Sequence, residues 1–151
     1  MESNQQRVIE NLNELVKLCN DGAQGYNNAA DGLKNAELKT IFHRLSQQRK
    51  GFVEDLKSEI RSMGGEIDDT RDVEGILHNT WVTIKAAITA NQTESIIEAC
   101  KTGEEFAYTK YEEILKDPEL PENIKSLLSE QHQLIRGAYT QLEQFEYEFT
   151  N

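Results

Sequence analysis

The sequence predicts an all-α protein, a four-helix bundle of long helices with a shorter helix between the second and the third. Proline occurs only twice in 151 residues, which leaves long helices uninterrupted. Four long segments place apolar residues at alternating steps of three and four, the spacing of a helix seam that faces partner helices. No segment has the features of a β-strand. At this length the chain is expected to form a single domain, residues 1–151.

The first two long helices are expected over about residues 4–31 and 35–63. Gly32 is the expected C-cap of the first helix, Asn35 the N-cap of the second, and Gly64-Gly65 its end. The connection between them is a few residues long, so they should form an antiparallel hairpin. The first seam contains Val8, Leu12, Leu15, Cys19, Gly22, Tyr26, Ala29 and Leu33, and the second Leu38, Phe42, Leu45, Arg49, Phe52, Leu56, Ile60 and Met63.

Two further long helices are expected over about residues 94–116 and 122–147, with Pro121 in the first turn of the last one. A shorter helix, about residues 73–90, precedes them within a connection long enough to traverse the bundle. Two tight hairpins joined by one long crossover form the ferritin-like arrangement. A five-helix up-and-down array is the alternative, because periodicity does not give the direction of the short helix.

Composition excludes several classes of function. The net charge is −11, from 27 acidic and 16 basic residues, and this repels nucleic-acid backbones. No apolar run approaches the ~20 residues that span a bilayer. The polar N-terminus lacks a secretory signal, so a cytoplasmic location is expected. Cys19 and Cys100 have no metal-ligand spacing and are expected to be buried free thiols.

Near their middles, all four long seams become polar. The first has Gly22 beside Asp21, the second Arg49, the third Glu104, and the last Gln131 beside His132. The favoured interpretation is a polar core layer of Asp21, Arg49, Glu104 and Gln131, in which an arginine–carboxylate network sets helix register. The alternative is a reduced or single-metal site for iron or manganese, with the candidate ligands Asp21, Glu104, Glu105 and His132.

A complete di-iron centre is not expected. Its ligands include a glutamate three residues before a histidine on each of two helices. The residues three before His43, His78 and His132 are Thr40, Gly75 and Ser129. No phosphate-binding loop or nucleophile elbow is present, so no catalytic residue is predicted and no cofactor is expected.

Aromatic residues suggest where the surface could bind. Any of Tyr139, Phe145, Tyr147 and Phe149 that is not needed in the core would form an apolar patch suited to a homodimer contact. His78 and Trp81 lie one turn apart on the short helix. They are expected to fix that helix to the bundle, with a contact surface as the alternative.

The whole chain resembles an uncharacterised bacterial family of ferritin-like four-helix-bundle domains. The resemblance rests on Asn20-Asp21-Gly22 with Gly25-Tyr26, Arg49 with Phe52, Gly64-Gly65, His78 with Trp81, and Gly103-Glu104-Glu105 with Tyr111. It implies the fold and a stress-related or housekeeping role, but no activity. Two hypotheses follow. One is a non-enzymatic bundle that acts through self-association or an unknown protein partner, and the other is the metal-binding protein described above.

Overall fold

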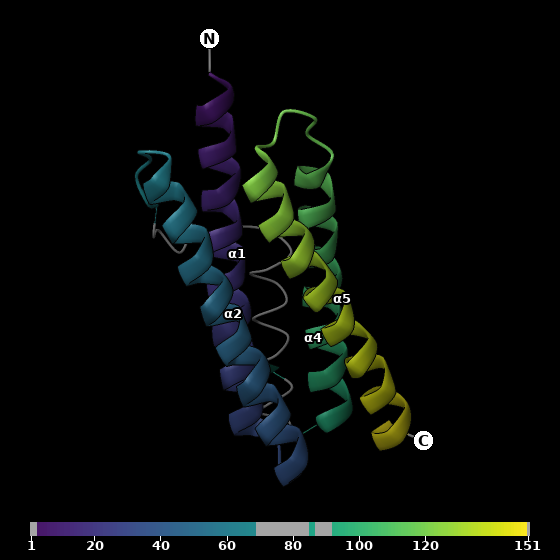
Figure 1. The fold of residues 1–151 in the computed structure, drawn as a ribbon. Coiled ribbons are helices and arrows are strands. Elements are labelled where there is room, and N and C mark those ends of the chain that lie inside the picture. The colour runs from purple at the N-terminus through teal and green to yellow at the C-terminus, as the bar shows by residue number, and fades with distance from the viewer. Residues whose placement is uncertain (1–2, 69–84, 87–91, 151) are drawn as a thin grey trace.

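The computed structural model describes residues 3–68, 85–86 and 92–150. These residues form an all-α four-helix bundle (Figure 1), which confirms the predicted class. Its helices are α1 (Asn4–Gly32), α2 (Ala36–Ser62), α4 (Thr93–Leu115) and α5 (Glu122–Thr150). The predicted short helix over residues 73–90, with His78 and Trp81, lies outside the described residues apart from Lys85 and Ala86.

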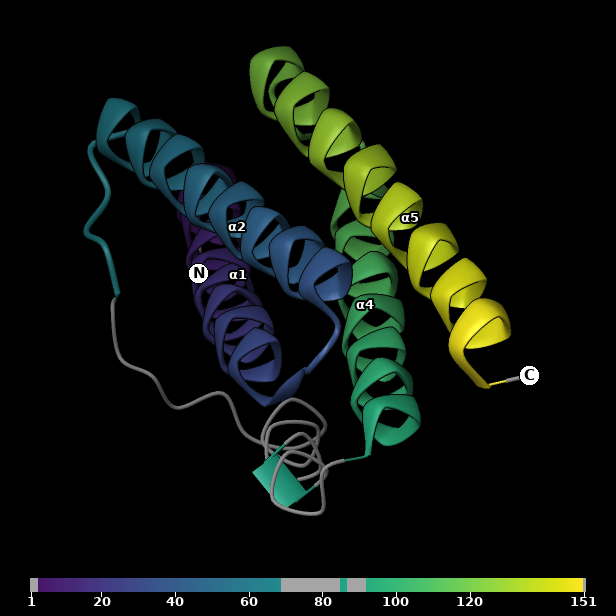
Figure 2. The ribbon, with the colours of Figure 1, turned by 90° about the horizontal axis from the view of Figure 1, so that it is seen from below.

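The helices form two antiparallel hairpins, α1 with α2 and α4 with α5. Figures 1 and 2 show that α2 ends at one end of the bundle and α4 begins at the other, so α2 and α4 run in the same direction. The hairpins meet mainly where α1 packs on α4, while α2 and α5 touch much less. None of the described helices is long and apolar enough to cross a membrane.

The α1–α2 turn shows one prediction confirmed and one corrected. Asn35 caps α2 as predicted, since its side-chain oxygen accepts the Leu38 backbone N–H at 3.0 Å. Gly32 is not the C-cap of α1: it is the last helical residue, and extended Leu33 follows as the cap. Leu33 is 3% exposed. Burial of this side chain directs the chain into the turn, so no left-handed residue is needed there.

The end of α2 is a Schellman motif that uses both predicted glycines. Gly64 has a φ of +75°, and its N–H donates to the Arg61 carbonyl while the Gly65 N–H donates to that of Ile60. A Cβ on Gly65 would lie 2.8 Å from the Ile9 side chain on α1. Gly64 therefore supplies the backbone conformation, and Gly65 permits the close approach of this turn to α1.

In the second hairpin, the turn between α4 and α5 is bound to the start of α1. Arg7 forms a salt bridge to Asp117 at 3.0 Å, and the Asp117 side chain accepts the Glu119 backbone N–H. Pro121 is not in the first turn of α5, as predicted, but directly precedes its first residue, Glu122. The Pro121 carbonyl accepts the Lys125 N–H. A proline fits there because it has no backbone N–H to leave unpaired.

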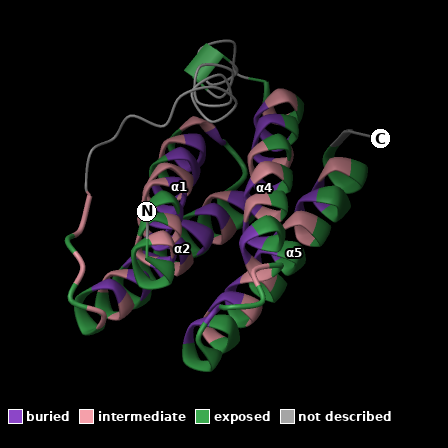
Figure 3. Cartoon of the chain, turned by 90° about the horizontal axis from the view of Figure 1, so that it is seen from above, coloured by how far each residue is buried: buried purple, intermediate pink, exposed green. Residues whose placement is uncertain are grey.

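Two apolar clusters fill the core, one toward each end of the bundle, and each helix turns its buried face inward (Figure 3). One cluster contains Leu12, Leu56 and Tyr111, and the other Phe42 and Leu142. Along α2 and α4, buried polar residues separate the two clusters. The buried polar residues of the described chain are Ser46, Arg49, Glu104 and Gln131.

Candidate functional site: a buried ion pair between the two hairpins

Arg49 on α2 and Glu104 on α4 form a two-pronged ion pair inside the bundle. Nη1 of Arg49 donates to Oε1 of Glu104, and Nη2 donates to Oε2, each at 2.5 Å. Both residues are 2% exposed. A planar guanidinium matches a carboxylate in this geometry, which gives direction as well as energy. The pair therefore fixes the level of α2 relative to α4.

Aromatic and small side chains enclose the guanidinium. Its central carbon lies 5.7 Å from the centre of the Tyr26 ring and 5.6 Å from that of Phe52, within the range of cation–π attraction. Gly22 of α1 lies beside the guanidinium, where an added Cβ would make an ordinary van der Waals contact with Arg49 at 3.7 Å. The charged seam position on α2 is thus accommodated by the two aromatic rings.

The guanidinium of Arg49 stays charged although it is buried. Burial alone would lower the pKa of Arg49, but attraction to Glu104 and hydrogen bonds to it outweigh this effect, so the pKa of Arg49 is raised. The Tyr26 hydroxyl is also buried, and its pKa is raised well above its ordinary range, first by burial and then by the Glu104 carboxylate. Tyr26 therefore stays neutral beside the pair at any ordinary pH.

A second polar chain crosses the core next to the ion pair. The Tyr111 hydroxyl donates to Oε1 of Gln131 at 2.7 Å and lies 3.2 Å from Sγ of Cys19. Burial is the main cause that raises the pKa of Cys19, to about 11, and it also raises the pKa of Tyr111. Sequence reasoning missed these hydrogen bonds: Cys19 was expected to be a buried free thiol, and Tyr111 entered only through the family resemblance. The signal for them was the hydrogen-bonding capacity of the thiol and phenol groups.

The four candidate metal ligands do not lie together. Glu104 is held by Arg49 in the core, whereas the next residue, Glu105, is exposed, and Asp21 is only partly buried. His132 lies between α4 and α5 near the surface, stacked on Tyr108 with the ring centres 4.1 Å apart. Burial lowers the pKa of His132. Within the described residues, no group of three or more histidine, cysteine, aspartate or glutamate side chains could hold a metal ion.

The donor set of a di-metal carboxylate centre therefore does not fit this core. Both oxygens of Glu104 accept hydrogen bonds from Arg49. A permanent cation at this level would also repel a metal ion brought next to it.

The outer surface of the second hairpin has a shallow groove, open to solvent. Glu105, Tyr108 and Thr109 of α4 line one side. From α5 come Arg136, Tyr139, Thr140 and Glu143. The guanidinium of Arg136 lies 6.0 Å from the centre of the Tyr108 ring, and Lys101 lies 5.6 Å from that of Tyr139. The groove thus carries aromatic faces and charges of both signs.

Fold and site together define a helical bundle with a buried arginine–glutamate ion pair and a tyrosine–glutamine hydrogen bond at its centre. The chain belongs to a family described as Domain of unknown function (DUF2383), whose model matches residues 7–117. The match includes Arg49, Glu104 and Tyr111, while the whole of α5 lies beyond it. No curated protein matches the chain. Membership of an uncharacterised family is confirmed; its bacterial range and ferritin-like character stay predictions.

Proposed function

We propose that this protein is a non-enzymatic, ferritin-like helical bundle that acts through its surface, by self-association or by binding a protein partner. The chain order supports the fold assignment. Two antiparallel hairpins are joined by one long connection that leaves α2 and α4 parallel, and a single long crossover of this kind is found in ferritin-like bundles.

One observation carries the functional proposal, the pairing of Glu104 with Arg49. Glu104 lies at mid-helix and points into the core, where ferritin-like enzymes hold their carboxylate ligands. Here its two oxygens bind a guanidinium instead of facing a cavity. The neighbouring side chains Tyr111 and Gln131 also bind each other, which supports a structural role for the centre of the bundle and a binding role for its surface.

Metal analysis tests this proposal. We expect purified, untagged protein to contain no stoichiometric iron, manganese or zinc by elemental analysis, and anaerobic titration with Fe²⁺ to give no saturable binding. The matched variant is Glu104→Gln, which removes the one core carboxylate of the described residues while keeping its size. Stoichiometric metal that disappears in Glu104→Gln would overturn the proposal and support the metal-binding alternative with Asp21, Glu104, Glu105 and His132.

A further inference from the structure

The groove on the α4–α5 hairpin carries two opposite charges on α5, one on each side of the midpoint of its α5 wall. Arg136 and Glu143 both line it and are both exposed. They are seven residues apart on α5, which is about two turns or ~10 Å along the helix axis, with Thr140 near the midpoint. Within the described part of the chain neither side chain forms an ion pair. Arg136 contacts Tyr108 through a 3.4 Å hydrogen bond to its hydroxyl.

This face is complementary in charge to the same face of a second copy that is rotated by 180°. If two copies of α5 pack antiparallel with a two-fold axis near Thr140, Arg136 of one copy faces the partner's Glu143. The same pair then forms a second time by symmetry, as in any isologous interface. A partner with charges of a single sign would instead meet a like charge, either Arg136 or the two glutamates Glu105 and Glu143 that also line the groove. The mixed charges of this groove therefore favour a second copy over a partner with charges of a single sign.

We infer that the protein forms a two-fold symmetric homodimer through this groove, with α5 packed against the partner's α5 and the Arg136–Glu143 pair formed twice. This inference rests on the proposed function, in which the chain acts through its surface. Tyr108 and Tyr139 supply aromatic area next to the charges, and Tyr147, which is 73% exposed, follows Glu143 by one turn on α5. Tyrosine and arginine are enriched among the residues that dominate interface energies.

The net charge of −11 on each copy opposes association. At physiological ionic strength this repulsion is screened beyond about 8 Å, whereas pairs formed in the groove are in direct contact. The dimer is therefore expected in buffers near 0.15 M salt.

Charge reversal with cross-rescue tests the inference by sedimentation velocity at 0.15 M salt. We expect wild-type protein to dimerise, and Arg136→Glu or Glu143→Arg alone to raise the dimer dissociation constant at least ~10-fold, because each creates two like-charge contacts. Mixing the two single variants one to one restores both pairs and should restore dimers. The double variant Arg136→Glu/Glu143→Arg should also dimerise like the wild type.

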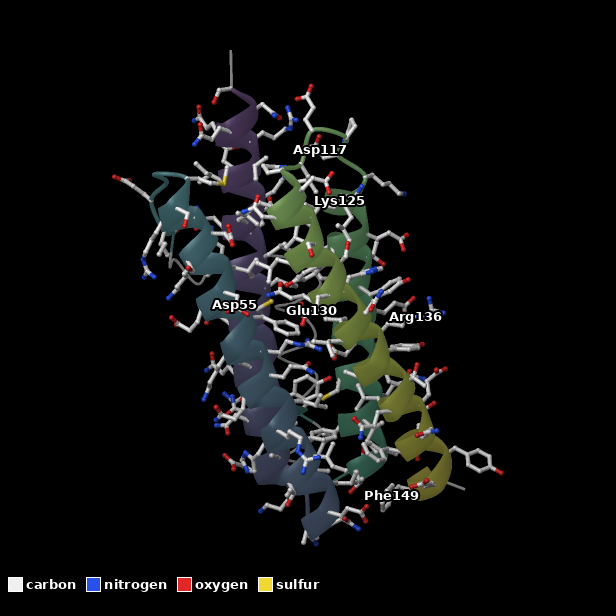
Figure 4. The ribbon with its side chains drawn as sticks, viewed as in Figure 1. Asp55, Asp117, Lys125, Glu130, Arg136 and Phe149 are labelled. Atoms are coloured by element: carbon white, nitrogen blue, oxygen red, sulfur yellow. The ribbon has the colours of Figure 1, made fainter. Side chains whose placement is uncertain are left out.

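Lys50→Glu on α2 and Glu130→Arg on α5 are the controls, because they reverse exposed charges outside the groove. Figure 4 shows Glu130 on the flank of α5 toward α2 and Arg136 on the other flank. Circular dichroism establishes that every variant is folded. A monomeric wild type, a dimer insensitive to the Arg136 and Glu143 reversals, or equal weakening by the controls would overturn the inference. Metal content is measured independently, so failure here leaves the result for the core unaffected.

Discussion

The guanidinium of Arg49 and the carboxylate of Glu104 join the two helical hairpins through the centre of the bundle. Besides this buried pair, the hairpins are held by packing between α1 and α4, by weaker contact between α2 and α5, and by salt bridges nearer the surface such as Arg7–Asp117 and Lys110–Glu14. Apolar contacts are non-directional and tolerate sliding, whereas a two-pronged ion pair has one geometry. The pair therefore specifies the relative height of the hairpins.

Removing one partner of this pair should be costly. We expect Arg49→Ala to lower the free energy of unfolding by about 3–5 kcal/mol, because Glu104 is left as an unpaired buried charge. The double variant Arg49→Met/Glu104→Leu should recover most of that loss, since an apolar pair of similar size leaves no buried charge. Urea denaturation measures both. A loss below ~1 kcal/mol for Arg49→Ala would mean that the pair is solvent-screened.

The Tyr111 hydroxyl should matter although it carries no charge. Tyr111→Phe removes the donor to Gln131 and leaves Oε1 of that buried amide without its partner, so we expect a loss of about 1–3 kcal/mol in urea denaturation. Tyr108→Phe is the matched control on the same helix. Its hydroxyl makes only an exposed 3.4 Å contact with Arg136, and its removal should change stability by less than ~0.5 kcal/mol.

The glycines at the end of α2 should respond differently from those in the middle of helices. Gly65→Ala should cost about 1–3 kcal/mol because its Cβ would overlap Ile9. The double variant Gly65→Ala/Ile9→Ala tests that cause: its cost should be smaller than the sum of the two single costs. Thermal denaturation measures all three variants, and a purely additive result would contradict the steric explanation.

Gly51 and Gly137 give the opposite prediction. A Cβ at either position meets nothing within 4 Å, and both glycines lie inside helices, where alanine is favoured by about 0.8–1 kcal/mol. We therefore expect Gly51→Ala and Gly137→Ala to raise the melting temperature, each by a few degrees. Destabilisation by Gly137→Ala in the isolated monomer would show that this face of α5 packs against something in the folded chain.

Stability should fall with rising pH above about 9, and Cys19 contributes to this. Burial raises the pKa of its thiol from 9.0 to about 11, so between these values the unfolded chain loses a proton that the folded chain keeps. The folded state then binds more protons, and the free energy of unfolding decreases as pH rises. Cys19→Ala should reduce that slope in urea denaturation series from pH 8 to 11, while an unchanged slope would contradict the assignment.

Local sequence features predicted most of the secondary structure. Seam periodicity, Asn35 and the Gly64-Gly65 pair act within a few residues, so the helices and the ends of α2 followed from them. Two predictions of helix ends were wrong by one position: Gly32 is not the C-cap of α1, and Pro121 is not in the first turn of α5. For Gly32 the reason is that the burial of Leu33 sets the end of α1. Helix boundaries depend on packing across the bundle as well as on the local chain.

Helix period and side-chain chemistry are local properties, so an all-α chain with charged residues at the middle of its seams could be predicted from the residues alone. Which of those residues come into contact depends on how the four helices pack. Glu104 and Glu105 are adjacent, yet one points into the core and the other to the surface, since successive helical residues are about 100° apart. Arg49 and Glu104 lie 55 residues apart. Their contact depends on the relative height of two helices that no local pattern encodes.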